Sequence, residues 1–129
     1  DTLRRREIAL AYFSGITNPE IQLPSITQAA NIQASQLCIN HLAAHVFHLF
    51  VIKTTQREKL QAHLAEQGIG TMIHYPIPPH KQQAYEEWNT HSYPLTEELH
   101  QQVLSLPISP VMTDGQVQAV ICSVNCFNF

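Results

Sequence analysis

The run "IHYPIPPHKQQAY", residues 73–85, limits the possible folds more than any other part of the chain. Three of its first seven residues are prolines. Because proline has no N–H to donate to a sheet, a strand that enters this run must end at Tyr75. The preceding segment, 69–75, is predicted to be such a strand. We therefore expect a strand followed by a rigid loop that carries two histidines and two tyrosines.

Apolar spacing and capping signals predict the helices. A first helix begins near Leu3 and is ended by Gly15 and the Asn18-Pro19 pair. A Thr55/Glu58 capping box opens a second helix, with Leu60 and Leu64 inward and Gly68 as its stop. A short helix is expected over 81–88. A fourth helix is capped by Thr96 and is expected to pack through Leu99, Val103 and Leu106. A capping box of Thr113 and Gln116 opens the last helix, whose apolar stripe consists of Val117, Val120, Ile121 and Val124.

Strands are expected at 20–24, at 45–53 as the central strand, at 69–75, and briefly at 105–110. Together with the helices, this order predicts an α+β fold: a small, mostly antiparallel sheet covered by helices. The chain length of 129 residues fits one compact domain, so residues 1–129 are interpreted as a single small domain.

Residues 21–52 contain no Asp, Glu, Lys or Arg. The run is too rich in Gln, Asn and Ser for a membrane helix. Charge depletion is typical of interface cores, so we expect this segment to lie against another protein layer, either a missing domain or a second subunit.

The net charge and the length of the apolar runs exclude some partners. A net charge of −3 gives no electrostatic footprint for nucleic acid or an anionic membrane, and no apolar run approaches the roughly 20 residues of a membrane span. Three cysteines, Cys38, Cys122 and Cys126, are expected to be free, partly buried thiols in a reducing cytoplasm. The opening "DTLRRRE" has no initiator Met and resembles the start of a piece cut from a longer chain.

Histidines and lysines are the first candidates for chemistry. His41, His45 and His48 have a spacing that would suit a metal on a helix, but the last two fall in the expected strand, and structural or surface roles are favoured. None of Lys53, Lys59 and Lys81 lies in a pattern that marks a desolvated, activated amine, so each is expected to be solvated.

The proline loop itself offers His74, Tyr75 and His80. A stiff loop loses little entropy on holding a ligand, and Tyr and His side chains give hydrogen bonds without a permanent charge. The residues alone leave two interpretations open. The loop either forms a wall that binds a ligand, or it is a connection whose shape the prolines set and whose aromatic residues are incidental.

Three stretches, "HVFHLFVI", "REKLQAHLAEQGIGTMIHYPIPPHKQQAY" and "YPLTEELHQQVLSLPISPVMT", resemble in this order the carboxy-terminal part of the nucleotide-sugar aminotransferases (the DegT/StrS family). The version "IHYPIPPHKQ" is most similar to the branch that acts on dTDP-3-oxo-6-deoxyhexoses. The similarity runs from about His45 to Phe127, and more loosely over the first helix. The uncharged irregular stretch 25–44 lies outside the pattern and is interpreted as an insertion.

The resemblance implies a pyridoxal-phosphate enzyme of the aspartate-aminotransferase fold type, of which this chain is the small domain. Such enzymes move an amino group from glutamate to a keto-sugar nucleotide, for deoxyaminosugar or surface polysaccharide synthesis, and work as cytoplasmic homodimers. The missing amino-terminal domain binds most of the cofactor and supplies its lysine, so the chain has no catalytic residue of its own. The resemblance assigns His74, Tyr75 and His80 to substrate positioning.

Three hypotheses remain open. The first is the small domain of a sugar aminotransferase, inactive alone. The second is a stand-alone protein-binding module of the same ancestry. The third, with least support, is a metal-dependent enzyme that uses His41, His45 and His48.

Overall fold

The computed structural model describes residues 1–26 and 32–128, and the predicted insertion at 25–44 lies partly outside them. Within the described residues its remaining part forms two short 3-10 turns. The elements in chain order are α1 (Thr2–Gly15), η2 (Ala34–Gln36), η3 (Ile39–Leu42), β1 (Phe50–Lys53), α2 (Arg57–Glu66), η4 (Pro79–Lys81), η5 (Gln83–Trp88), α3 (Pro94–Gln102), β2 (Val103–Leu106) and α4 (Asp114–Cys126). No helix among them has the length and hydropathy needed to cross a bilayer.

The sheet is antiparallel, as predicted, and consists of β1 paired with β2, with Phe50 opposite Leu106 and Lys53 opposite Val103. Two single bridges widen it, one from Gln22 to Lys53 and one from Met72 to Ser105. The strand predictions for 20–24 and 69–75 were therefore wrong beyond one residue each. After Met72 the segment binds side chains instead of a strand. His74 contacts the hydroxyl of Ser105, and the carbonyl of Tyr75 accepts a hydrogen bond from His100.

The prediction of a strand over 45–53 was wrong for its first half, because β1 begins only at Phe50. The Nδ1 atom of His45 accepts a hydrogen bond from the N–H of Phe47, which closes a local turn. Phe47 has a φ of 47°, outside the extended region. Arginine side chains donate to the carbonyls of His45, Phe47 and His48, so these carbonyls bind side chains rather than a neighbouring strand.

The helix predictions were partly confirmed. The first helix, the stop at Gly68 and the Thr113/Gln116 capping box are present. The Thr55 box is absent: α2 begins at Arg57 after Gln56, without a side-chain cap. The helix expected from Thr96 to Leu106 begins at Pro94 and ends at Gln102, because its apolar tail pairs with β1 as strand β2. Residues 79–88 form 3-10 turns rather than one helix.

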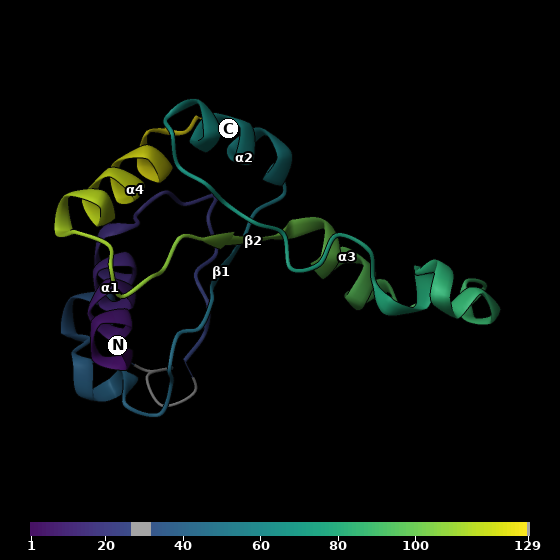
Figure 1. Ribbon diagram of the computed structural model, residues 1–129, viewed down its shortest axis with the longest axis horizontal. Helices are drawn as coiled ribbons and strands as arrows, with labels where there is room; N and C mark the ends of the chain where they lie inside the picture. Colours follow the sequence, from purple (N-terminus) through teal and green to yellow (C-terminus); the bar gives the residue numbers. More distant parts are fainter. Residues whose placement is uncertain (27–31, 129) are drawn as a thin grey trace.

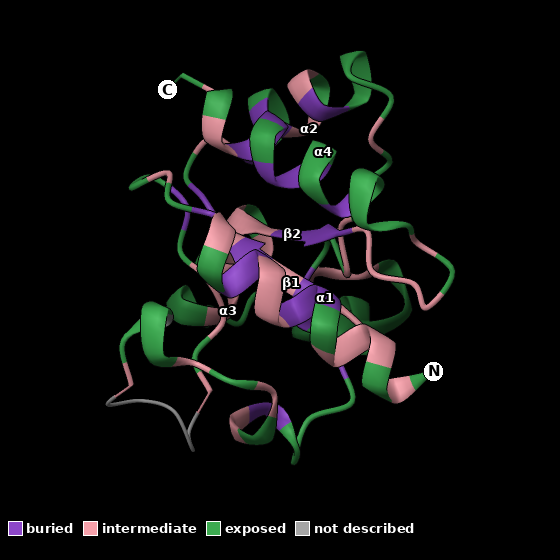
Figure 2. Ribbon diagram, turned by 90° about the vertical axis from the view of Figure 1, so that its left-hand side faces the viewer, coloured by how far each residue is buried: buried purple, intermediate pink, exposed green. Residues whose placement is uncertain are grey.

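The core lies where α1, α2 and α4 cover the sheet (Figures 1 and 2). Most of the predicted inward residues are buried, including Leu60 and Leu64 of α2 and the stripe Val117, Val120, Ile121 and Val124 of α4. Leu99 and Val103 are only partly buried, so for them the prediction was wrong. The ring of Tyr12 packs edge-on against Phe50, with centroids 5.0 Å apart, and its hydroxyl donates to the carbonyl of Pro107 at 2.6 Å. Burial raises the pKa of this hydroxyl, so it stays a donor.

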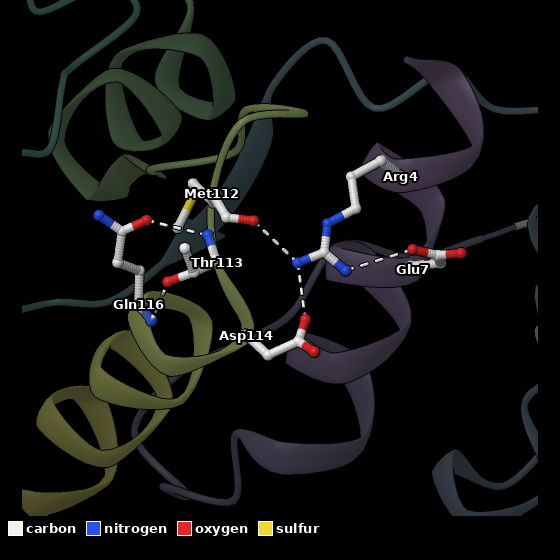
Figure 3. A network of polar contacts seen from close by, with 6 residues as sticks. All are labelled: Arg4, Glu7, Met112, Thr113, Asp114 and Gln116. Carbon is white, nitrogen blue, oxygen red and sulfur yellow. Dashed lines mark hydrogen bonds and ion pairs between the residues drawn. The ribbon is translucent and has the colours of Figure 1, made fainter.

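Three consecutive arginines of α1 hold the loops before β1 and after β2, and Arg5 contacts both loops. Arg4 donates to the carbonyl of Met112 at 2.8 Å and to the carboxylate of Asp114 at 2.7 Å, beside the cap of α4 (Figure 3). Arg5 donates to the carbonyls of Phe47, His48 and Ile108, and Arg6 to those of Ala43 and His45. Part of the uncharged 21–52 segment thus obtains its cationic partners from α1.

An arm, residues 75–102, projects from this body and includes η4, η5 and α3 (Figure 1). Most of its large apolar side chains are exposed: Tyr75, Ile77, Tyr85, Trp88, Tyr93 and Leu95. The rings of Tyr85 and Trp88 stack with centroids 4.9 Å apart and an interplanar angle of 7°. The arm is therefore held by polar contacts and ring pairs rather than by the core.

Asn125 of α4 fastens the end of α1. Its amide donates to the carbonyl of Gly15 at 2.8 Å, and its side-chain oxygen accepts from the N–H groups of Thr17 and Asn18 at 2.8 and 3.2 Å. The side-chain amide of Asn18 donates two hydrogen bonds in the other direction, to the carbonyls of Val124 and Phe127 at the end of α4. One amide thus satisfies three main-chain groups where the two helices meet.

We predict that Asn125→Ala lowers the free energy of unfolding by about 1–3 kcal/mol, because three main-chain groups, two of them partly buried, lose their partner. Urea unfolding followed by circular dichroism measures the change. Gln118→Ala, at an exposed position of the same helix, is the control and should change the stability by less than about 0.5 kcal/mol. Equal effects of the two substitutions would contradict the fastening role.

Candidate functional site

His74 lies beside β2 at the base of the arm. The Met72 bridge brings it there: the N–H of Ser105 donates to the Met72 carbonyl at 2.8 Å, and the N–H of Met72 donates to the Ser105 carbonyl at 3.2 Å. The Nδ1 atom of His74 is then 2.9 Å from the hydroxyl oxygen of Ser105. This leaves the other ring nitrogen for a further partner.

Tyr75 follows with an exposed ring, 66% accessible, whose edge meets the His74 ring at a centroid distance of 5.6 Å. The Tyr75 carbonyl accepts a hydrogen bond from Nδ1 of His100 in α3. The carbonyl of His100 in turn accepts from the guanidinium of Arg57, which is 8% exposed at the start of α2. The base of the arm is thereby tied to the body.

His80 lies inside the arm and is 4% exposed. Its Nε2 atom donates to the carboxylate of Glu97 at 2.8 Å, and its ring meets Tyr93 edge-on at 4.8 Å. The N–H of Tyr93 also donates to Glu97, at 3.0 Å. These hydrogen bonds, that of Tyr93 first and that of His80 second, hold the pKa of the Glu97 carboxyl below its usual value. Glu97 therefore closes the 80–93 loop onto α3.

The structure brings together two of the three predicted site residues. His74 and Tyr75 are in ring contact, whereas the partners of His80 among the described residues belong to the arm itself. Ser105, Glu97, His100 and Arg57, which hold these residues, were missed by sequence reasoning. Only Ser105 had a sequence signal, as the single polar residue of the apolar stretch "VLSLP".

The other candidates have local roles. His41 pairs with Cys38, and His45 with the N–H of Phe47. Within residues 1–26 and 32–128 no group of three His, Cys, Asp or Glu side chains is placed to hold a metal ion. The three cysteines are free thiols and are exposed, so the expectation of partial burial was wrong.

A pyridoxal phosphate does not fit the lysines of this chain. Lys81 donates to the carbonyls of Asn89 and His91, both at 2.9 Å, and so holds an arm loop. Lys59 is exposed on α2, and Lys53 is partly exposed at the end of β1. A covalently bound cofactor needs a desolvated, activated amine, which the described residues do not offer.

Comparison with known proteins identifies the family and the relatives of this chain. The model of the DegT/DnrJ/EryC1/StrS aminotransferase family matches residues 2–125. The dTDP-3-amino-3,6-dideoxy-alpha-D-galactopyranose transaminase of Aneurinibacillus thermoaerophilus is 48% identical over the whole chain, which covers 32% of that relative. The dTDP-3-amino-3,4,6-trideoxy-alpha-D-glucose transaminase of Streptomyces venezuelae is 36% identical over 94% of the chain and 29% of its own length. The chain thus spans about a third of these relatives.

Solved structures agree on the fold. DesV of S. venezuelae, in complex with a ketimine intermediate, matches 95% of this chain and 30% of its own with a TM-score of 0.75 and 36% identity. NtdA of Bacillus subtilis, with the bound cofactor PMP, matches 94% of this chain and 27% of its own with a TM-score of 0.74 and 27% identity.

We predict that Glu97→Gln loosens the arm and does so in a pH-dependent way. The folded pKa of Glu97 is lowered, so its contribution is present above the unfolded carboxyl pKa of about 4.3 and is lost as the pH falls through the folded value. The difference between wild type and variant should thus be largest near pH 7 and vanish in strong acid. Hydrogen exchange of the 80–93 loop measures it, with the exposed Glu98→Gln as control. A pH-independent difference would contradict this account.

Proposed function

Because the chain belongs to the DegT/DnrJ/EryC1/StrS aminotransferase family, we propose that it is the small, carboxy-terminal domain of a longer transaminase that transfers an amino group from glutamate to a keto-sugar nucleotide. The match over residues 2–125, against relatives about three times as long, is the observation that carries the proposal. Both relatives are dTDP-sugar transaminases by name, which supports a dTDP-linked substrate.

In this proposal the cofactor is pyridoxal phosphate, bound by the amino-terminal domain that the longer protein supplies. The engagement of Lys81 and the exposure of Lys59 support that division, because the cofactor lysine must then come from elsewhere. The parent works as a cytoplasmic homodimer, which is consistent with three free cysteines in a reducing compartment.

The assignment of His74, Tyr75 and His80 to substrate positioning divides into two roles. His74 and Tyr75 form the wall that contacts the sugar nucleotide, since the Tyr75 ring is exposed and one nitrogen of His74 is unused by Ser105. His80 supports this wall from within the arm through Glu97. No proton transfer at the reacting carbon is assigned to any of the three.

The alternative is a stand-alone protein-binding module of the same ancestry, and the exposed apolar side chains of the arm favour it as a specific observation. The two readings differ in what lies upstream of Asp1. An additional large domain with a cofactor lysine supports the transaminase, whereas a start codon directly before Asp1 supports the module.

We predict that His74→Ala in the full-length protein raises KM for the dTDP-linked keto-sugar about tenfold, with kcat little changed, because a substrate hydrogen bond is lost. Steady-state kinetics with glutamate as amino donor measures both constants. His48→Ala, at a histidine outside the arm, is the control. Full-length protein that binds pyridoxal phosphate yet does not aminate any dTDP-linked keto-sugar would overturn the proposed function.

We predict that the 129-residue chain self-associates through its arm, because the surface that faces the larger domain is exposed. Light scattering should show association that Trp88→Ser reduces strongly. Val111→Ser, at an apolar side chain 84% exposed outside the arm, should leave it unchanged. A monodisperse monomer at high concentration would count against an arm built for docking.

A further inference from the structure

Ser105 is a buried polar residue in an apolar strand. Leu104 and Leu106, its neighbours in β2, face the core with 0% and 3% of their surface exposed. Because successive strand residues point to opposite faces, Ser105 points to the other face, where its hydroxyl meets the His74 ring, and it is 5% exposed. A valine would suit this place in a purely structural strand, so the hydroxyl calls for a separate explanation.

The hydroxyl is one of three contacts between Ser105 and the 72–74 segment. The two main-chain hydrogen bonds with Met72 fix how the segment lies along β2. The side-chain contact at 2.9 Å then fixes the rotation of the His74 ring. The main-chain pair would form with any residue except proline at position 105, so only the side-chain contact depends on serine.

The chemistry of the partners decides which atom carries the proton. His80 and His100 each face a carboxylate or carbonyl oxygen, which only accepts, so the facing nitrogen of each ring must carry a hydrogen. His74 instead faces a hydroxyl, which can donate or accept. The buried O–H of Ser105 needs an acceptor, and within the described residues its contact is Nδ1 of His74.

We propose that Ser105 is a positioning residue that donates to Nδ1 of His74 and so keeps the ring proton on Nε2. His74 then presents an N–H donor on the side away from β2. Such a donor recognises an acceptor oxygen, here a carbonyl or phosphate oxygen of the keto-sugar nucleotide. The identity of this ligand rests on the proposed function, whereas the tautomer does not.

The first experiment measures the tautomer itself, in the 129-residue chain with 15N-labelled histidine. Two-bond proton–nitrogen NMR correlations distinguish a nitrogen that carries a hydrogen from one that does not, and His74→Gln identifies the His74 signals by their loss. We expect a bare Nδ1 and a protonated Nε2 in the wild type. Ser105→Ala should give a mixture of both tautomers. A protonated Nδ1 in the neutral wild-type ring, or an unchanged tautomer in Ser105→Ala, would overturn the proposal.

The second experiment uses the full-length transaminase. Ser105→Ala should raise KM for the keto-sugar nucleotide about threefold to tenfold, the loss of a typical hydrogen bond, with kcat retained. Ser105→Cys, which keeps a weak donor of similar size, should fall between wild type and alanine. The double variant Ser105→Ala/His74→Ala should be no worse than His74→Ala, because Ser105 acts through His74.

Ser123→Ala is the matched control, a buried serine of α4 that binds His63 through its carbonyl and not through its hydroxyl. It should change neither the His74 tautomer nor KM. Additive effects in the double variant would overturn the positioning role. A tautomer that shifts without any change in KM would instead overturn the substrate contact of His74, and with it that part of the proposed function.

Discussion

The hydrogen bonds of three successive arginines to the two loops that flank the sheet, 43–49 and 107–113, are the interaction on which the rest of the structure depends. Residues one apart on a helix point about 100° from each other, so Arg4, Arg5 and Arg6 reach outward in different directions from one turn of α1. Arg5 alone ties the loop before β1 to the residues after β2, through the carbonyls of Phe47 and Ile108. The two strands of the small sheet are thus held together at their ends as well as along their ladder. A two-stranded sheet is marginal by itself, so this outside support matters more here than in a larger sheet.

The order of constraints runs from the body to the arm. With β2 fixed, Ser105 offers main-chain and side-chain groups to the segment at Met72 and His74. Arg57 and His100 fasten the next residue, Tyr75, and Glu97 closes the outer loop. Each step uses polar groups where a core would use apolar ones, because the arm has little surface of its own to bury. Polar contacts set direction more strictly than apolar packing does, which suits the proposed role of this segment in placing His74 and Tyr75.

Sequence reasoning predicted what depends on local signals. The Thr113/Gln116 box, the stop at Gly68 and the buried stripe of α4 each lie within a few residues of their cause, and all three were confirmed. It failed where a distant partner decides: the aromatic run before Phe50 has strand composition, yet Arg5 and Arg6 take its carbonyls from across the fold. The apolar tail of the helix expected from Thr96 became a strand for the same reason, since its partner is β1. The site follows this rule too, because His74 was visible in the sequence while its partner Ser105 lies 31 positions away.

The rigidity of the proline loop has a physical explanation in this scheme. Three prolines restrict the backbone between Tyr75 and His80, so the two ends of the loop cannot move independently. One end is fixed through His74 on β2, and the other through buried His80 on α3. A flexible connection would let the arm turn about its base and would carry the exposed ring of Tyr75 with it. Prolines remove that freedom before any ligand binds, so less conformational entropy remains to be lost on binding. The loop is therefore best understood as a spacer that fixes the distance between the body and the tip of the arm.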